Sequence, residues 1–322
     1  MKSFKITALS LVLVLLLAAC GAKNDTPDEP AVDPTPEPPI EQPVEKTPDE
    51  RINDIIADMS IEEKVGQLFF VRCPETGAAE DVETYHLGGL LLFGRDYKDA
   101  NGDWLTEDDF TAALASYQAA AAIPLFIGSD EEGGTVTRAS KNPNLFSEPL
   151  PSPQELYAAG GLDGLLERTL SYNQKLKAFA PVCDVSTNPD NFIYARSFGQ
   201  DAQTTADYIS SVVPVYAQSG VACVLKHFPG YGNNADTHTG IALDARPYTT
   251  FEKSDLVPFE SGIAAGAPFV LVSHNIVECM DGAYPASLSA KVHTLLRDTL
   301  GFTGVIVTDD LAMDAVKAYA QD

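Results

Sequence analysis

The residues best suited to chemistry lie close together, between positions 226 and 238. Lys226 and His227 end an apolar segment, Pro229 and two glycines turn the chain, and the following loop carries Asp236 and His238. A carboxylate two positions from an imidazole can orient the ring and raise its basicity, so that the ring exchanges a proton near neutral pH. Taken alone, such an Asp-x-His pair also fits a solvated turn.

Polar side chains also follow several other apolar segments of the chain. They occur at 129–134, at Asp184, at 273–274 and at 308–310, where Asp309 and Asp310 are adjacent. Neighbouring residues of a strand point to opposite sides, so we expect only one of these two aspartates to face a common site. Periodicity alone does not choose between them. His274 is a further candidate for the pocket lining.

The elements that would position these residues follow a regular order. We expect seven buried strands, at 67–73, 89–94, 124–130, 178–185, 222–228, 268–274 and 305–310. Helical spacing lies between most of them, at 108–122, 202–219, 255–266 and 289–300. Continuous apolar strands are buried on both faces, which is typical of a parallel sheet.

This order predicts the α/β class and, within it, a (β/α)8 TIM-type barrel. In such a barrel the carboxyl ends of the strands form the face that carries the active site. A doubly wound open sheet is the rival, but its ligand would bind at one switch point, whereas polar residues here follow five strands. Because the last expected strand lies close to Asp322, we expect a barrel truncated after its seventh strand.

Composition excludes some classes of function. The 322 residues include 21 Lys and Arg against 46 Asp and Glu, a net charge of −25, which disfavours nucleic acid as a partner. Hydrophobic residues make up 45% of the chain, enough for a large packed core. No Cys or His spacing typical of a metal site occurs, and we expect no metal and no organic cofactor. We expect Cys73, Cys183 and Cys223 to be buried thiols.

The N-terminal segment resembles an export signal. Two lysines precede a short apolar run that ends in Leu-Ala-Ala-Cys, the pattern of a bacterial lipoprotein signal. We therefore expect a signal peptide at 1–19, a lipidated Cys20 that begins an acidic, Pro-rich linker at 20–46, and a folded domain at 47–322. This predicts an exported protein, anchored by lipid to the bacterial cell membrane and facing outward. At the start of the domain, Thr47 and Ser60 each precede a Glu by three positions, which predicts two helix starts.

The stretch Lys-His-Phe-Pro-Gly-Tyr-Gly at 226–232, with Asp-Thr-His at 236–238, resembles the KHFPGHG and DSH signature of glycoside hydrolase family 3, in its β-N-acetylhexosaminidase branch. Further stretches resemble motifs of the same family in the same order. They are DEEGGTVTR at 130–138, APVCDV at 180–185 with NP at 188–189, RSFG at 196–199, PASLS at 285–289 and GFTGVIVTDDLAM at 301–313. Tyr231 and Thr135 depart from the pattern, which has His and Arg there.

Carried over by position, the resemblance implies roles for eight residues. Asp309 would be the nucleophile, and His238 the acid/base in a dyad with Asp236. The sugar-binding residues would be Asp130, Arg138, Arg196, Lys226 and His227. Retaining glycoside hydrolysis needs a carboxylate that traps the sugar covalently and a second group that moves the proton, so the residue types agree.

The resemblance implies a retaining exo-β-N-acetylglucosaminidase that removes terminal N-acetylglucosamine from peptidoglycan fragments. Its partners would be an amino-sugar glycan or muropeptide and the membrane, with no nucleic acid. The alternatives are a β-glucosidase or a glycoside phosphorylase of the same family, and a catalytically silent glycan-binding surface lipoprotein. A metal-dependent barrel hydrolase is disfavoured because no His-x-His or His-Glu-x-x-His spacing occurs.

Overall fold

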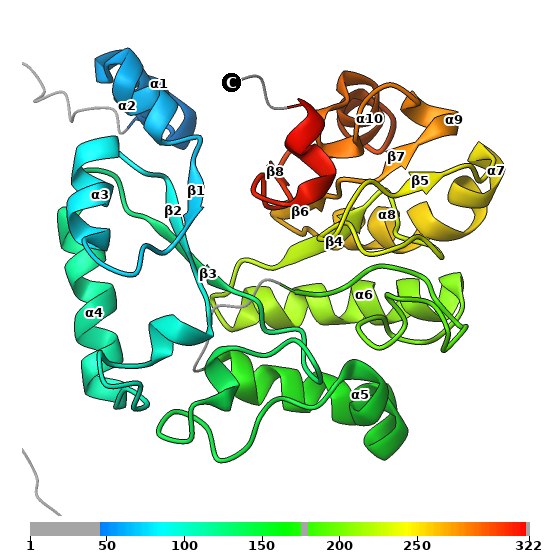
Figure 1. Cartoon of the computed structure of the whole chain (residues 1–322), viewed down its shortest axis with the longest axis horizontal. Coiled ribbons are helices and arrows are strands. Elements are labelled where there is room, and N and C mark those ends of the chain that lie inside the picture. The colour runs from blue at the N-terminus through cyan, green and yellow to red at the C-terminus, as the bar shows by residue number, and fades with distance from the viewer. Residues whose placement is uncertain (1–45, 175–179, 320–322) are drawn as a thin grey trace, which may run out of the picture. The chain divides into compact units, whose positions relative to one another are not determined.

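The computed structural model describes residues 46–174 and 180–319 (Figure 1). Asn53–Asp322 forms one compact unit, which contains all residues with a predicted catalytic or sugar-binding role. The predicted signal peptide, the lipidation site at Cys20 and all but the last residue of the predicted linker lie outside the described residues.

Two helices begin where the sequence carries capping signals. α1 (Pro48–Asp58) follows Thr47, whose hydroxyl accepts a hydrogen bond from the backbone N–H of Glu50. α2 (Ile61–Gly66) follows Ser60, and Ser60 and Glu63 exchange side-chain and backbone hydrogen bonds in a complete capping box. These bonds satisfy N–H groups that the first helical turn leaves without a partner.

The first three strands form one parallel sheet. β1 (Phe70–Arg72), β2 (Gly89–Leu92) and β3 (Phe126–Ser129) pair in the order β1-β2-β3. α3 (Ala78–Tyr85) and α4 (Glu107–Ala120) lie beside this sheet (Figure 1). Their apolar side chains share a core with Leu90 and Leu92 on one face of β2, while Leu91 on the other face packs toward residues of later strands.

A second parallel sheet has the order β4-β6-β8, with β4 (Val224–Phe228), β6 (Phe269–Val272) and β8 (Val305–Thr308). α6 (Ala202–Gln218) and α8 (Leu256–Ala264) pack in the core behind it. Gly262 allows this close approach, since a Cβ there would lie 2.6 Å from Leu225 and 2.9 Å from Ile209. Any larger residue there would force the side chains of Leu225 and Ile209 to shift in a packed core.

The two sheets meet through a small apolar cluster. Val224, Phe269 and Leu271 of the second sheet pack with Phe70 and Leu91 of the first. Phe126 and Phe269 also meet edge to face, with ring centroids 5.1 Å apart. The strands of both sheets therefore enclose a common interior, with helices outside it.

The structure confirms six of the seven expected strands and corrects the other. The segment expected at 178–185 is no strand in its described part: Val182 forms one parallel bridge with Lys226, and Ala180 and Pro181 accept hydrogen bonds from β4. Pro181 cannot donate to a ladder, which limits strand formation there. The sequence prediction missed two short paired strands, β5 (Leu243–Asp244) and β7 (Ile276–Val277).

Two expected helices are shorter and less regular than their spacing suggests. The expected helix at 255–266 is α8, which a π-turn at Phe251–Asp255 precedes, and that at 289–300 divides into α10 (Ala290–Thr294) and a π-turn at Leu295–Thr299. The remaining helices are α5 (Pro153–Asn173), α7 (Tyr248–Thr250) and α9 (Glu278–Asp281). Short 3₁₀ turns occupy Gly94–Tyr97, Ala139–Lys141, Ala286–Leu288 and Asp314–Tyr319.

The described fold is thus mixed α/β with small parallel sheets, as expected. A complete eight-stranded barrel, and its truncation after the seventh strand, stay predictions. Cys73, Cys183 and Cys223 are buried as predicted. Within the described ranges, no helix combines the length and apolar character needed to cross a bilayer.

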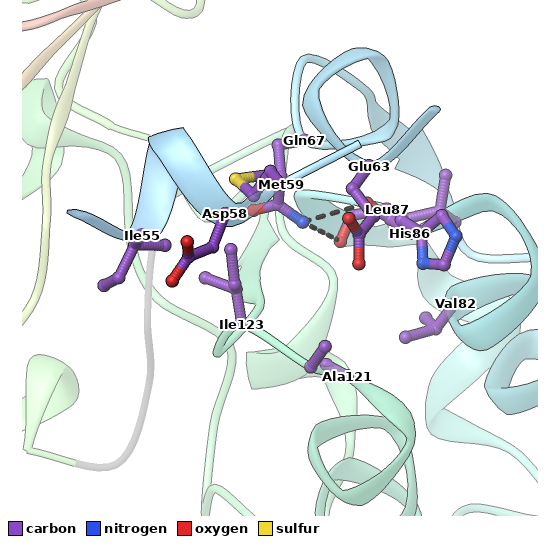
Figure 2. A pocket seen from close by; sticks show the side chains of 11 residues that line it. Ile55, Asp58, Met59, Glu63, Gln67, Val82, His86, Leu87, Ala121 and Ile123 are labelled. Atoms are coloured by element: carbon purple, nitrogen blue, oxygen red, sulfur yellow. Dashed lines mark hydrogen bonds between the residues drawn. The ribbon is translucent and has the colours of Figure 1, made fainter. Parts of the chain in front are cut away.

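A small cavity of about 270 Å³ lies among α1, α2, the end of α3 and the turn after α4 (Figure 2). Gln67, directly after α2, donates from its amide to the carbonyl oxygens of His86 and Leu87, at 2.9 and 3.3 Å. These bonds tie the end of α2 to the end of α3. None of the predicted site residues lines this cavity.

Candidate active site

A second, larger cavity brings the predicted residues together. It measures about 780 Å³ and is bounded by β1, β4, β8 and the loops that follow the strands. Seven of the eight residues with a predicted role line it, namely Asp130, Arg138, Arg196, Lys226, His227, His238 and Asp309. The eighth, Asp236, contacts His238. The cavity is therefore shared by residues that are up to 179 positions apart in the chain, counting from Asp130 to Asp309.

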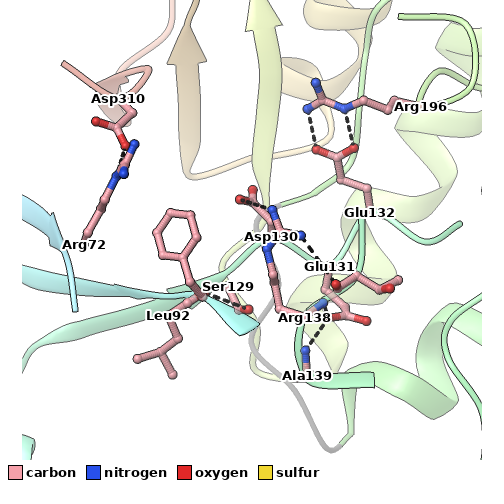
Figure 3. Close-up of polar contacts among 12 residues, drawn as sticks. Arg72, Leu92, Ser129, Asp130, Glu131, Glu132, Arg138, Ala139, Arg196 and Asp310 are labelled. Carbon is pink, nitrogen blue, oxygen red and sulfur yellow. Dashed lines mark hydrogen bonds and ion pairs between the residues drawn. The ribbon is translucent and has the colours of Figure 1, made fainter. Parts of the chain in front are cut away.

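Glu132 forms ion pairs with two cationic side chains of the site, Arg196 and Lys226. Its carboxylate accepts two hydrogen bonds from the Arg196 guanidinium, at 2.7 and 2.8 Å (Figure 3), and lies 2.6 Å from Nζ of Lys226. The Glu132 side chain is only 1% exposed. Burial alone would raise the pKa of Glu132, but the charges of Lys226 and Arg196 hold it far below its usual range. Glu132 is therefore a fixed negative charge beneath the cavity.

Asp130 presents a carboxylate on the cavity side of this network. Its Oδ1 accepts a hydrogen bond of 2.8 Å from Nζ of Lys226, and its Oδ2 lies 3.9 Å from the guanidinium of Arg138. Burial alone would lower the pKa of Lys226, but the carboxylates of Asp130 and Glu132 raise it. Alternating acceptors and donors of this kind can bind the hydroxyl groups of a sugar.

A buried carboxylate fixes the state of His227. Asp184 lies 2.7 Å from Nδ1 of His227, and Arg196 Nη2 lies 2.9 Å from Nε2 of the same ring. A guanidinium has only donors, so Nε2 must accept and Nδ1 must carry the proton that Asp184 accepts. Asp184 and Arg196 therefore fix the orientation of the His227 ring, which lines the cavity.

A break in strand register explains why two successive residues of β4 reach the cavity. The pairing of β4 with β6 shifts between Leu225 and Phe228, and Lys226 and His227 lie inside the shift. In a regular strand, neighbouring side chains point to opposite faces. An irregularity at this point re-aims one of them, as bulges near active sites do.

The loop after β4 carries the predicted dyad. Oδ1 of Asp236 lies 2.6 Å from Nδ1 of His238 and also accepts a hydrogen bond of 2.9 Å from the His238 backbone N–H. Burial alone would raise the pKa of Asp236, but these hydrogen bonds and the imidazole charge lower it. The contact occupies Nδ1 and leaves Nε2 of His238, whose side chain is 59% exposed, for proton exchange.

The expectation for the two adjacent aspartates is wrong. Both Asp309 and Asp310 line the cavity, because β8 ends at Thr308 and strand alternation does not extend past it. Oδ1 of Asp309 accepts a hydrogen bond from the backbone N–H of Asp310, at 2.9 Å, and Asp310 pairs with Arg72 (Figure 3). Asp309 has no cation partner among the ion pairs of the described residues, which leaves it available for substrate.

His274 does not line the cavity as the sequence suggested. Its side chain is fully buried, with Nδ1 2.7 Å from the Ser287 hydroxyl and Nε2 2.9 Å from the carbonyl oxygen of Asp310. A backbone carbonyl is only an acceptor, so Nε2 donates. His274 therefore supports the turn that presents Asp309 and Asp310.

Sequence reasoning assigned no role to three buried carboxyl residues at the strand ends, Glu131, Glu132 and Asp184. Glu131 accepts hydrogen bonds from the backbone N–H groups of Arg138 and Ala139, at 2.9 and 3.0 Å, and so closes the loop that presents Arg138. The available signal was the unbroken acidic run at 130–132 directly after a buried strand. The partners of Glu132 and Asp184 come from distant parts of the chain, and spacing could not reveal them.

Comparison with known proteins identifies the family of this chain. Residues 60–322 match the model of the glycosyl hydrolase family 3 N-terminal domain. The chain belongs to glycosyl hydrolase family 3. This is a family of glycoside hydrolases, and its matched region contains every residue of the candidate site.

Named relatives of this family 3 chain include β-hexosaminidases. It is 31% identical over 252 residues to a β-hexosaminidase of Nitrosomonas eutropha, covering 72% of this chain and 68% of the relative. It is 32% identical over 273 residues to β-hexosaminidase LpqI of Mycobacterium tuberculosis, covering 80% and 67%. The fold resembles a family 3 β-N-acetylglucosaminidase from a Paenibacillus species, with a TM-score of 0.72, 29% identity and coverage of 81% of this chain. The chain spans 51% of that structure and about two thirds of the curated relatives.

Proposed function

We propose that this family 3 protein is a retaining exo-β-N-acetylglucosaminidase. One observation carries the proposal: a carboxylate that follows β8, Asp309, and an imidazole on the loop after β4, His238, line the same cavity. Around them are charged groups suited to a hydroxyl-rich ring, Asp130 and Arg138 among them. Named relatives that act on hexosaminides support the choice of sugar.

In the proposed first step, the Asp309 carboxylate attacks the anomeric carbon and the bond to the leaving oxygen breaks. His238 gives the proton on Nε2 to that oxygen, and Asp236 stabilises the imidazolium beforehand. The product is a glycosyl ester of Asp309. In the second step, water loses a proton to His238, attacks the anomeric carbon from the other side and releases the carboxylate. Two inversions give net retention.

The remaining predicted residues would bind the sugar. Lys226 and Arg138 offer donors, Asp130 accepts, and the ring of His227 lines the cavity. Because Glu132 holds Lys226 and Asp184 holds His227 before substrate arrives, little ordering of these two side chains is needed on binding. Preorganised charged groups of this kind stabilise charge that develops in the transition state.

The experiment that tests this proposal is product analysis by proton NMR. The full-length protein is mixed with 4-nitrophenyl N-acetyl-β-glucosaminide, and the anomeric signals are followed from the first minutes. The β-anomer of N-acetylglucosamine should form first and then equilibrate. Initial release of the α-anomer would reject double displacement, and no release at all would favour the glycan-binding alternative.

A second candidate is a glycoside phosphorylase. The observation in its favour is the acid/base itself, since an imidazole repels a phosphate nucleophile less than a carboxylate does. Parallel assays with and without inorganic phosphate, on the N-acetylglucosaminide and on the glucoside, distinguish the N-acetylglucosaminidase from the phosphorylase and from a β-glucosidase. Sugar 1-phosphate as the product would identify a phosphorylase, and preference for the glucoside a β-glucosidase.

We also propose that peptidoglycan fragments are the natural substrate, and that lipid on Cys20 tethers the protein to the outside of the cell membrane. The signal-like residues 1–19 and the Pro-rich segment that follows support this placement. Metabolic labelling with an alkyne-bearing fatty acid tests the tether. The wild-type protein should take up the label and Cys20→Ala should not, whereas labelling of both would reject Cys20 as the site.

A further inference from the structure

The loop that carries the dyad has one buried point of attachment near its tip. Between residues 233 and 241, Thr237 is the only buried residue, and it lies directly between Asp236 and His238. Its side chain and backbone N–H face inward to a single group, the hydroxyl of Tyr231. The two dyad residues, in contrast, have side chains that are 30% and 59% exposed.

Tyr231 makes two hydrogen bonds to Thr237. Its hydroxyl oxygen accepts from the backbone N–H of Thr237, at 2.9 Å, and lies 2.7 Å from the Thr237 hydroxyl. A phenol can accept the first bond and use its own proton in the second, so both are satisfied together. Burial raises the pKa of Tyr231, which keeps the phenol neutral and able to donate.

The other end of Tyr231 is fixed to the sugar-binding residues. Its backbone N–H donates to Oδ1 of Asp184, at 2.6 Å, while Oδ2 of the same carboxylate lies 2.7 Å from Nδ1 of His227. The rings of Tyr231 and His227 also meet edge to face, with centroids 5.7 Å apart. Tyr231 is 2% exposed, so its own position is set by packing.

We infer that Tyr231 is a positioning residue that holds the Asp236–His238 dyad in register with the sugar-binding residues. The inference rests on the proposed function. Tyr231 and His227 both hydrogen-bond to Asp184. Through its bonds to Thr237, Tyr231 fixes the position of Asp236 and His238 relative to the cavity. A displacement of about 1 Å at a reacting group can cost about 100-fold in rate, so this link controls turnover without touching substrate.

Tyr231→Phe tests the link, since it removes only the hydroxyl and leaves the buried N–H of Thr237 without a partner. We expect kcat on an unactivated N-acetylglucosaminyl disaccharide to fall by about 10- to 100-fold, with KM changed by less than about 2-fold, because the sugar contacts stay intact. Thr237→Val keeps the backbone bond and loses the hydroxyl partner, so its kcat should lie between those of the wild type and Tyr231→Phe.

Azide separates a positioning role from a merely structural one. Azide attacks the glycosyl-enzyme without losing a proton, so it needs no base and yields a glycosyl azide. We expect added azide to raise kcat of Tyr231→Phe on the nitrophenyl substrate and to leave the wild type unchanged. Tyr172→Phe is the matched control, because it removes a buried phenol that donates to the carbonyl oxygen of Glu148, at 2.9 Å, far from the loop in the sequence. It should lose stability but keep kcat and show no response to azide.

Hydrogen exchange gives a readout that does not depend on activity. In full-length Tyr231→Phe, the peptide that spans residues 231–241 should exchange faster than in the wild type, while peptides from β6 and α6 should not change. Unchanged exchange in this peptide, unchanged kcat, or an azide response shared with Tyr172→Phe would overturn the inference. If the wild type cleaves no glycoside but the peptide responds, the proposed function fails and the link from Tyr231 to Thr237 stands.

Discussion

Nζ of Lys226 lies 2.6 Å from Oε1 of Glu132, and both side chains are almost completely buried. Lys226 lines the cavity with the other residues expected to bind sugar, and Glu132 lies behind it. Arg196 shares the same carboxylate, while Lys226 is also paired with Asp130. Such a buried network is sensitive to the loss of its central member, because Arg196 would lose its ion pair and Lys226 one of its two carboxylate partners.

Glu132→Gln should therefore destabilise the protein by about 3–5 kcal/mol at pH 7. The folded-state pKa of Glu132 is depressed, so its stabilising effect is complete above the usual glutamate range near 4.5. It is lost as the pH falls below that range, where the unfolded chain binds a proton and the folded chain does not. Urea unfolding from pH 7 to pH 3.5 should show a difference from wild type that is constant at first and then shrinks. A difference that grows on acidification would contradict this assignment.

Arg246 holds a second network, behind the loop after β4. Its guanidinium donates to Asp244, at 2.8 Å, and to Asp255, at 3.0 Å, and both carboxylates are buried. Arg246→Met should cost about 3–5 kcal/mol in the free energy of unfolding, because two buried carboxylates lose their partner. Arg168→Met is the control, since Arg168 pairs with Glu148 at the surface and should contribute at most about 1 kcal/mol. Equal effects in denaturant titrations would reject the role of Arg246.

Gly232 has no room for a side chain. Its φ is +58°, and a Cβ there would lie 2.4 Å from the guanidinium carbon of Arg246. We expect Gly232→Ala to lower the free energy of unfolding by about 1–3 kcal/mol and to reduce kcat by displacing the dyad loop. Gly240→Ala, in the same loop, meets nothing within 4 Å and should be neutral in both measurements. A neutral Gly232→Ala would show that the loop tolerates movement at this point.

His238→Ala should have an effect that depends on the leaving group. Loss of a general acid costs about 10²- to 10⁴-fold when the leaving oxygen must be protonated, and far less when it leaves as nitrophenolate. The comparison is of kcat/KM for an unactivated disaccharide and for the nitrophenyl glycoside, because this ratio reports the first step. Equal losses on both would argue that His238 binds substrate and moves no proton. His86→Ala, at the end of α3, is the control variant.

The sequence predicted more of the fold than of the contacts within the site. Apolar runs placed six strands, because burial on both faces leaves a continuous signal. The motif residues from Asp130 to Asp309 were expected to meet, since they follow strands whose carboxyl ends share one edge. The prediction failed at two points: Pro181 interrupts the segment at 178–185, and β8 ends before Asp309, so both adjacent aspartates reach the cavity.

Residue spacing could not predict hydrogen-bond and ion-pair partners that come from distant segments of the chain. Nothing within a few positions of Glu132 indicates that it pairs with Arg196 and Lys226, which lie 64 and 94 positions away by their numbering. The role of Tyr231 was equally hidden. It was visible in the sequence only as a departure from a family pattern, whereas its hydrogen bonds to Thr237 depend on how the loop closes.

The most direct test of the account is to identify the residue that becomes glycosylated. The full-length protein is incubated with a slow-turnover fluorinated N-acetylglucosaminyl substrate, digested with protease and examined by peptide mass spectrometry. The account predicts one sugar adduct, on Asp309, that is absent from Asp309→Ala, a variant that should also fail to hydrolyse the nitrophenyl glycoside while remaining folded. An adduct on Asp310 or on any other residue, or undiminished hydrolysis by Asp309→Ala, would contradict it.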